Sequence, residues 1–179
     1  ETMALSFADE HFDVSILELP YIFGAQKGRK PVWVFLVEML RGMKGAVLYP
    51  RGGTAMVTVR QVGQAFAGAL ERGRGGNAYP IGWFNLTWKE MIAIMHRYMG
   101  TPDKKIITIP TWVFALGAKQ IEKKQRSAGT EGGLLMEKFV DLQTKNLFID
   151  KTEACVPLSV TDDDIEAAIG ESVSLSMEV

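Results

Sequence analysis

The sequence predicts an α/β fold, and three observations support this prediction. Strand and helix patterns alternate through the first two thirds of the chain, and helices dominate the remainder, which is typical of domains built on parallel strands. No internal repeat is present. The chain has 179 residues, of which 47% are hydrophobic and 23% charged, so it is long and apolar enough to bury the core of one domain.

The first elements follow from apolar spacing and from proline and glycine. Apolar side chains three and four apart in residues 3–8 indicate the last turns of a helix. The apolar run of residues 14–19 predicts a strand, which Pro20 ends. The apolar stripe of residues 32–42 predicts a helix that stops near Gly42.

The next elements are two short strands and an amphipathic helix. The strands are expected at residues 46–49 and 56–59, on either side of the turn signal of residues 51–53. Apolar residues then recur with helical spacing over residues 61–72, and Gly73 closes that helix.

A short strand at residues 77–81 precedes the helix with the clearest signals. Thr87 as N-cap and Glu90 three residues later form a capping box, and Gly100 supplies the C-terminal stop. Its buried side is expected to carry Trp88, Met91, Ile92, Met95 and Met99. His96 is expected on the polar side of this helix, as a solvated residue.

The last third is predicted to be mainly helical. A strand at residues 106–109 leads to Pro110, which starts a helix with an apolar stripe and a Lys/Arg-rich end that we interpret as a solvated face. That stripe consists of Trp112, Leu116 and Ile121. A second helix is expected around residues 134–142, and Thr161 with Asp164 is expected to cap a short helix that ends at Ile169.

Charge and cysteine content argue against several classes of function. The 20 Lys and Arg against 21 Asp and Glu give a net charge of -1, so no strong field attracts nucleic acid or a membrane surface, and we expect neither as a partner. The longest uninterrupted apolar run, residues 32–37, is far shorter than the ~20 residues of a membrane span. Cys155 is the only cysteine, which fits a reducing, cytoplasmic compartment.

Motifs of common catalytic and metal sites are missing. Neither His11 nor His96 has a second ligand at metal-binding spacing, and no G-x-S-x-G or P-loop string occurs. The acidic run of residues 162–164 is interpreted as a helix start rather than a metal site. Residues 73–78 match the loose form G-x-G-x-x-A, but they follow a helix and precede a strand, the reverse of a dinucleotide-binding loop.

The order of the motifs nevertheless resembles a known family. Leu17 to Gly24 reads LELPYIFG, a helix and Gly52-Gly53 follow, and VTVRQVGQAF then precedes NAYPIG and the helix capped at Thr87. This succession resembles the C-terminal half of the extended short-chain dehydrogenases/reductases, the NAD-dependent epimerase/dehydratase group. The resemblance covers residues 1–110 well and the remainder loosely.

The resemblance implies the C-terminal portion of a Rossmann-like doubly wound fold with a mainly helical substrate-binding lobe. Residues 1–75 would be the last strands and helices of the Rossmann-like domain, truncated upstream, and residues 76–179 the substrate-binding lobe and C-terminal tail. The partners that the resemblance implies are a second copy of the chain in a homodimer, a small-molecule substrate and the missing N-terminal Rossmann half. The strand 14–19 and the helix 32–42 should then expose an apolar face, since neighbouring strands are missing.

The resemblance also implies NAD or NADP as cofactor of the full-length protein, bordered on its nicotinamide side by Pro20, Tyr21, Ile22, Phe23 and Gly24. A strand end followed by a turn is the alternative interpretation of these five residues. We expect no cofactor bound to this chain alone, because the phosphate-binding loop is absent.

The catalytic pair of the family, a Tyr with a Lys four residues later, is absent. The residues four positions after Tyr21, Tyr49, Tyr79 and Tyr98 are Ala25, Gly53, Trp83 and Pro102. A phenol needs the nearby ammonium group to act as acid or base near neutral pH. We therefore predict no catalytic residue and no metal ligand in this chain, which would be inactive alone. A non-catalytic member that senses NAD(P) or binds a protein stays open as the alternative.

Three departures from the family pattern bear on the substrate. Glu18-Leu19-Pro20 stands where family members usually have Arg-Pro, Thr54 stands where sugar-nucleotide members carry an Arg, and Gln61 replaces the usual Asp. Without that Arg the clamp on a diphosphate is missing. A smaller or more apolar substrate than a nucleotide sugar is therefore expected.

Overall fold

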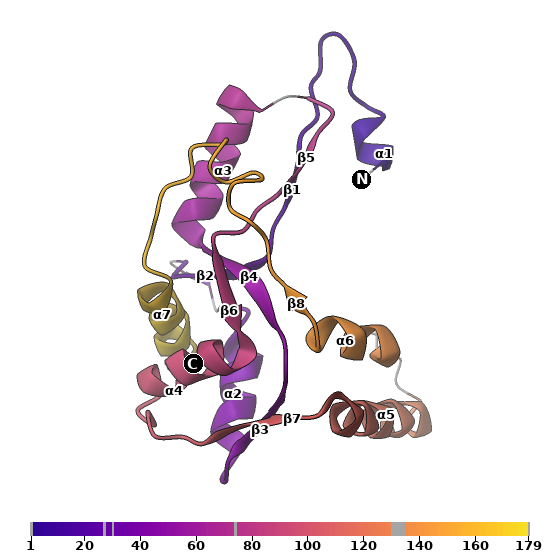
Figure 1. The fold of residues 1–179 in the computed structure, drawn as a ribbon, viewed down its shortest axis with the longest axis vertical. Coiled ribbons are helices and arrows are strands. Elements are labelled where there is room, and N and C mark those ends of the chain that lie inside the picture. Colours follow the sequence, from indigo (N-terminus) through magenta and orange to yellow (C-terminus); the bar gives the residue numbers. More distant parts are fainter. Residues whose placement is uncertain (1, 27, 30, 74, 130–134, 179) are drawn as a thin grey trace.

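The computed structural model describes residues 2–26, 28–29, 31–73, 75–129 and 135–178, and it confirms the predicted α/β class (Figure 1). The strands are β1 (Ile16–Glu18), β2 (Tyr21–Phe23), β3 (Val47–Pro50), β4 (Gly53–Thr58), β5 (Ala78–Pro80), β6 (Phe84–Thr87), β7 (Ile106–Ile109) and β8 (Asn146–Leu147). The helices are α1 (Thr2–Leu5), α2 (Val34–Gly42), α3 (Val59–Arg72), α4 (Trp88–Tyr98), α5 (Thr111–Ser127), α6 (Met136–Gln143) and α7 (Ile165–Met177). The sequence did not predict β2, β6 or β8, and residue 134, the expected start of α6, lies outside the described residues.

Parallel pairing dominates the sheets, as predicted. Strand β1 pairs with β5, β2 with β4, and β3 with β7, all in parallel, whereas β6 runs antiparallel to β4. Strand β8 adds a short parallel pairing to the start of β4. The β1–β5 pair joins residues before and after residue 75, so β1 and β5 belong to different predicted units but to one sheet. The boundary between residues 1–75 and residues 76–179 remains a prediction.

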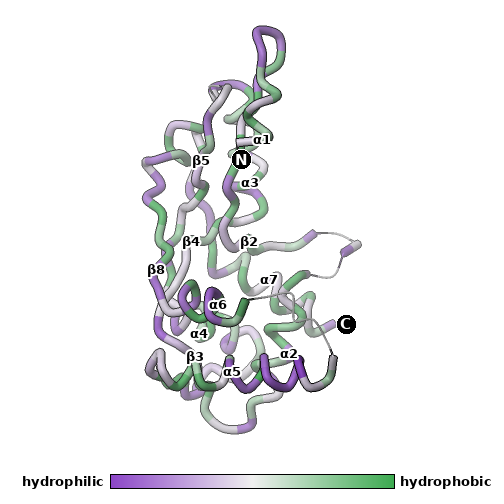
Figure 2. The backbone as a smooth tube through the Cα atoms, turned by 90° about the vertical axis from the view of Figure 1, so that its right-hand side faces the viewer, coloured by the Kyte–Doolittle hydropathy of each residue, from purple (hydrophilic) through white to green (hydrophobic). Residues whose placement is uncertain are grey.

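Two hydrophobic clusters hold these sheets. In the larger one α2, α4 and α7 pack together beside β2 and β4, with Val37, Leu40, Met91 and Ile169 fully buried. Figures 1 and 2 show these helices gathered at one end of an elongated molecule, while β1, β5 and α3 extend toward the other end. The second cluster joins α3 to the turns of residues 154–160. Among the described residues, no helix is long and apolar enough to cross a membrane.

The helix caps show which boundaries were predictable. The predicted capping box of α4 is confirmed, since Glu90 N donates to Thr87 Oγ1 at 3.3 Å and Thr87 N donates to Glu90 Oε2 at 2.8 Å. The Thr87 hydroxyl, which donates to Glu90 Oε2 at 2.7 Å, and secondly the Thr87 amide lower the pKa of the Glu90 carboxyl. A second capping box, formed by Thr58 and Gln61, starts α3 at Val59. The expected strand 56–59 therefore ends at Thr58, and the helix begins two residues earlier than predicted.

The last helix differs from its prediction at both ends. Asp164 caps it, with its carboxylate accepting from Ala167 N at 2.9 Å, and the helix continues to Met177 instead of Ile169. Thr161 does not cap it, because its hydroxyl accepts a hydrogen bond from Gln64 Nε2 of α3 at 2.8 Å. The predicted helix stop at Gly73 is confirmed.

The prediction of a solvated His96 is wrong. The residue is 2% exposed, its Nδ1 lies 2.8 Å from Thr101 Oγ1, and its Nε2 is buried with no hydrogen-bond partner among the described residues. The reason is that α4 packs against α7 and also against β3, β6 and β7, so more than one side of the helix is covered. Burial, and secondly the charge of Lys104, lower the pKa of His96.

We expect this buried histidine to make stability depend on pH. Because its pKa is lower in the folded state, the unfolded chain binds more protons once the pH falls below about 6.5, and stability is lost as the pH falls from that value through the folded pKa. His96→Asn should remove this loss as the pH falls below about 6.5. Urea unfolding at several pH values measures it, with His11→Asn at an exposed position as control. An unchanged pH dependence in His96→Asn would contradict the prediction.

Candidate functional site

The five residues predicted to border a cofactor form β2 and its two flanks. Tyr21 and Phe23 point into the larger hydrophobic cluster, whereas Ile22 packs against the second one. This alternation is the two-residue period of a strand, and β2 is held in register by Ile22 opposite Val57 of β4. Pro20 and Gly24 are half-buried and Phe23 is fully buried. The segment therefore lies between the two hydrophobic clusters, and the buried Phe23 side chain anchors β2 in the larger one.

Trp33 ties this segment to α2. Its indole Nε1 donates to the carbonyl oxygen of Ile22 at 2.9 Å, and its ring stacks on Phe23 with centroids 4.5 Å apart and planes 13° apart. The tryptophan satisfies a backbone carbonyl and packs its ring at the same time, which suits a buried indole. The start of α2 is thus fixed to the strand that carries the predicted site.

An aromatic cluster continues from Trp33 into the core. The Tyr21 ring lies 5.0 Å from Trp33 and 5.4 Å from Trp88, and Tyr49 of β3 lies 6.3 Å from Trp88. Burial, and secondly repulsion from Tyr21, raise the pKa of Tyr49 to about 12. This phenol stays protonated near neutral pH, so it does not serve as a base there.

Helix α7 fixes the end of the segment. Gly24 adopts φ +134°, a conformation that favours glycine, and its amide donates to Ser172 Oγ at 2.9 Å. Ser172 Oγ in turn donates to Ala168 O at 3.1 Å, and the next amide, that of Ala25, donates to Glu171 Oε2 at 3.2 Å. The sequence carried no signal for Ser172 or Glu171, because they lie 148 and 146 residues from their partners.

A pocket of about 400 Å³ opens beside Gly24, between the first turns of α3 and α7. Asp163 lies in its wall and accepts from Thr58 Oγ1 at 2.5 Å and from Arg60 Nε at 3.0 Å. The Arg60 guanidinium, followed by the Thr58 hydroxyl, lowers the pKa of the Asp163 carboxyl. The cation of Arg60 is thus already paired within the chain. The described residues contain no cluster of three or more His, Cys, Asp or Glu suited to a metal ion.

Two of the three departures from the family pattern, Thr54 and Gln61, are inside the fold. Thr54 is buried in β4 opposite Leu86 of β6, and Gln61 is fully buried, where its Nε2 donates to Thr161 O at 3.0 Å. Neither residue presents a charge to a ligand. The structure therefore places no cation at either position.

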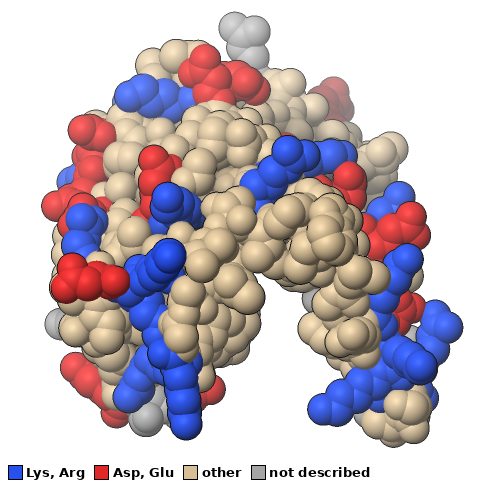
Figure 3. All heavy atoms as spheres, turned by 60° about the horizontal axis from the view of Figure 1, so that its bottom comes forward, with Lys and Arg blue, Asp and Glu red and all other residues tan. Residues whose placement is uncertain are grey.

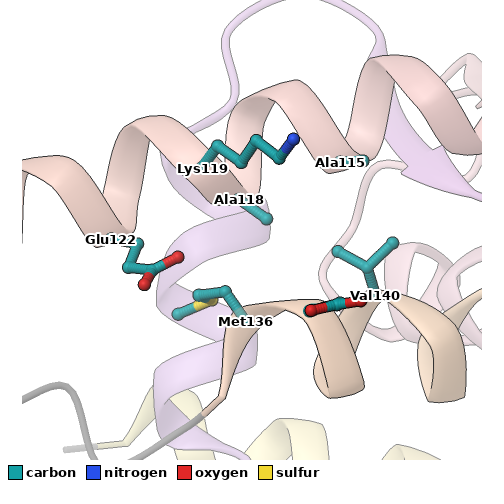
Figure 4. A pocket seen from close by; sticks show the side chains of 7 residues that line it. Ala115, Ala118, Lys119, Glu122, Met136 and Val140 are labelled. Atoms are coloured by element: carbon teal, nitrogen blue, oxygen red, sulfur yellow. The ribbon is translucent and has the colours of Figure 1, made fainter.

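Two further cavities lie away from this segment. One of about 430 Å³ separates α5 from α6 and is shown in Figure 4, where Lys119 and Glu122 extend from α5 and Met136 and Val140 come from α6. The other, of about 520 Å³, lies between β1 and α3 and is lined in part by the exposed Phe66 and Leu70.

Comparisons with known proteins show the fold. No family model and no curated protein matches the sequence. Solved structures do match: a protein designated gox2253 (TM-score 0.65, 18% identity, 92% of this chain and 49% of that chain), and a nucleoside-diphosphate-sugar epimerase from Pseudomonas aeruginosa (0.63, 15%, 99% and 52%). A dTDP-glucose 4,6-dehydratase from Bacillus anthracis in complex with NAD also matches (0.58, 15%, 99% and 49%). The chain spans about half the length of these structures, and its fold is that of part of an epimerase/dehydratase structure, as the resemblance implied.

Proposed function

We propose that this chain is the C-terminal portion of an NAD(P)-dependent epimerase, dehydratase or reductase of the short-chain dehydrogenase type, and that it contributes the substrate-binding lobe. The observation that carries the proposal is the fold, which matches nearly the whole chain to about half of each structure, one of them bound to NAD. The motif order from Leu17 to Thr87 supports the C-terminal assignment.

Within this function, residues 20–24 border the nicotinamide side of the cofactor. Support comes from Gly24, whose backbone conformation and hydrogen bond to Ser172 fix the end of the segment, and from the rigid aromatic cluster behind Tyr21. The pyrophosphate of a dinucleotide needs a glycine-rich turn from strand to helix, which this sequence does not contain. NAD(P), when bound, supplies the hydride chemistry, and these residues orient it and exclude water.

We further propose that the chain divides near residue 75, that its substrate is a small molecule and that the protein forms a homodimer. The single cysteine supports a location in the cytoplasm. Residues 1–179 alone are expected neither to bind NAD(P)H nor to turn over a substrate, because the phosphate-binding loop and the Tyr-x-x-x-Lys pair are missing from them.

The test is to express the complete open reading frame that encodes the chain and to titrate its product with NADH and NADPH, following nicotinamide fluorescence. The complete product should bind and residues 1–179 alone should not. Gly24→Val should weaken binding about tenfold, since φ +134° strains any side chain. Gly45→Ala is the control, because an added Cβ there meets nothing within 4 Å.

Other results decide against the proposal or in favour of its alternative. Micromolar binding of NADPH by residues 1–179 alone, or none by the complete product, would overturn it. Binding by a complete product that lacks Tyr-x-x-x-Lys and turns over no substrate would identify a non-catalytic sensor.

A further inference from the structure

Helix α2 has an open side and a buried side. Val32, Phe35 and Met39 are 72%, 62% and 41% exposed, which confirms the predicted apolar face on residues 32–42. Figure 3 shows this end of the molecule, where mainly uncharged residues surround an open gap and Lys and Arg side chains lie toward the ends of its two flanks. The buried side of α2 packs on α7 and into the cluster that contains Phe23. The elements that hold the segment 20–24 therefore meet on this buried side.

Helix α7 is well placed to support that segment. It packs against α2, α4, β2 and β4, and its side chains Ile169 and Val173 are fully buried in the larger hydrophobic cluster. Asp164 caps its first turn. Because these neighbours fix the position of α7, side chains on its buried face can hold another part of the chain in place.

Ser172 on the buried face of α7 binds the backbone of Gly24. Its hydroxyl accepts from the Gly24 amide at 2.9 Å, and it lies 3.3 Å from the carbonyl oxygen of Gly24 and 3.1 Å from that of Ala168. The hydroxyl has one hydrogen, so it donates to one of these two carbonyl groups at a time. The Ser172 side chain is fully buried, and a buried hydroxyl costs free energy unless it is hydrogen-bonded. Alanine would avoid that cost, so the contact with Gly24 is what serine adds at this position.

The conformation of Gly24 needs such support. Its φ of +134° is one that other residues rarely adopt, and an added Cβ would lie 3.1 Å from Val59 Cγ2 at the start of α3. Glycine loses more backbone freedom than other residues when it is fixed, and an unusual conformation persists only where its surroundings hold it. Two side chains of α7 do so, Ser172 at the Gly24 amide and Glu171 at the Ala25 amide.

The strand and the helix divide the support of the segment between them. Pairing with β4 holds Tyr21, Ile22 and Phe23, and Thr58 is the last partner in this register. Gly24 lies one residue beyond the pairing, where the hydrogen bond to Ser172 takes over. The direction of the backbone at the end of the segment therefore depends on α7.

We infer that Ser172 is a positioning residue for the cofactor: by holding Gly24, it keeps the end of the segment 20–24 in the conformation that accepts the nicotinamide. The inference rests on the proposed function and adds to it a residue of the last helix. Ser172 is fully buried, so it acts through Gly24 and does not touch the cofactor itself. When a binding segment is in the competent conformation for only part of the time, the apparent affinity falls by that fraction.

The test compares NADH with ADP-ribose, which lacks the nicotinamide, on the product of the complete open reading frame. Ser172→Ala should raise the Kd of NADH about tenfold and leave the Kd of ADP-ribose within about twofold, as measured by isothermal titration calorimetry. Ser172→Cys keeps nearly the same shape with a weaker acceptor and should give an intermediate Kd of NADH. Circular dichroism verifies that each variant is folded.

Ser176→Ala is the matched control. Ser176 is also buried on α7, but its hydroxyl donates to the carbonyl oxygen of Ser172 within the helix, at 2.6 Å. Removing it should change neither Kd, because this hydrogen bond does not reach the segment 20–24.

Hydrogen exchange of the Gly24 amide provides a readout that needs no cofactor. In residues 1–179, Ser172→Ala should speed this exchange about tenfold, because the amide loses its acceptor. Ser176→Ala should leave the exchange unchanged.

Three outcomes would overturn the inference and leave the proposed function intact. They are an equal loss of affinity for NADH and ADP-ribose in Ser172→Ala, an unchanged Kd of NADH in that variant, and an unchanged exchange rate of the Gly24 amide. The first would indicate a general loss of structure, and the other two would show that the hydrogen bond does not hold the segment. Absence of NADH binding by the unchanged complete product would overturn the proposed function and this inference together.

Discussion

Replacing Trp88 with alanine is expected to lower the free energy of unfolding by about 3–5 kcal/mol. The side chain is 2% exposed and contacts the rings of Tyr21 and Tyr49. Its indole Nε1 also donates to the carbonyl oxygen of Gln143 at 2.7 Å, which ties α4 to the end of α6. The substitution leaves a cavity in the larger hydrophobic cluster and a carbonyl without its donor.

Urea unfolding at neutral pH, followed by far-ultraviolet circular dichroism, measures this effect. Lys89→Ala, at the exposed neighbouring position of α4, is the matched control and should change stability by less than about 0.5 kcal/mol. Trp88→Phe should recover part of the loss, because it fills most of the space without restoring the hydrogen bond. A loss below about 1 kcal/mol in Trp88→Ala would show that the cluster does not depend on this ring.

Two glycines of α3 are expected to respond to the same substitution with opposite signs. A Cβ at Gly68 would lie 2.0 Å from the carbonyl oxygen of Leu158, so Gly68→Ala must push residues 154–160 away from the helix. We expect a loss of about 2–3 kcal/mol. A Cβ at Gly63 meets nothing within 4 Å, so Gly63→Ala should stabilise the helix by about 0.5–1 kcal/mol.

The pair is measured by thermal and urea unfolding of both variants in the same buffer. Because the two positions share one helix and one substitution, helix propensity acts equally on both and the difference between them reports the close approach to Leu158. Equal stabilisation by both substitutions would mean that the segment of residues 154–160 does not pack on α3 in solution.

Features set by neighbouring residues could be predicted from the sequence. Thr87 and Glu90 cap α4 from three residues apart, and the bounds of β7, residues 106–109, match the prediction. Pro20 and Gly24 mark the ends of the proposed cofactor-bordering segment through their own backbone preferences. These signals act within a few residues, so no knowledge of the tertiary structure is needed to recognise them.

Contacts between distant residues decided the remaining features. The periodicity of α5 indicated an apolar stripe but not that Trp112 and Leu116 would stay exposed, because exposure depends on which element packs beside them. His96 is buried by the packing of α4 against elements far along the chain, and Thr161 bonds to α3 instead of capping α7.

By itself, the sequence determined the α/β class, most helix and strand positions, and the place of the segment 20–24. Only the tertiary structure decided what holds that segment, namely Trp33 of the following connection and Ser172 of the last helix, and which apolar faces remain open. The physical reason is that local backbone preferences are encoded in adjacent residues, whereas burial and hydrogen bonding across 148 residues exist only once the chain has folded.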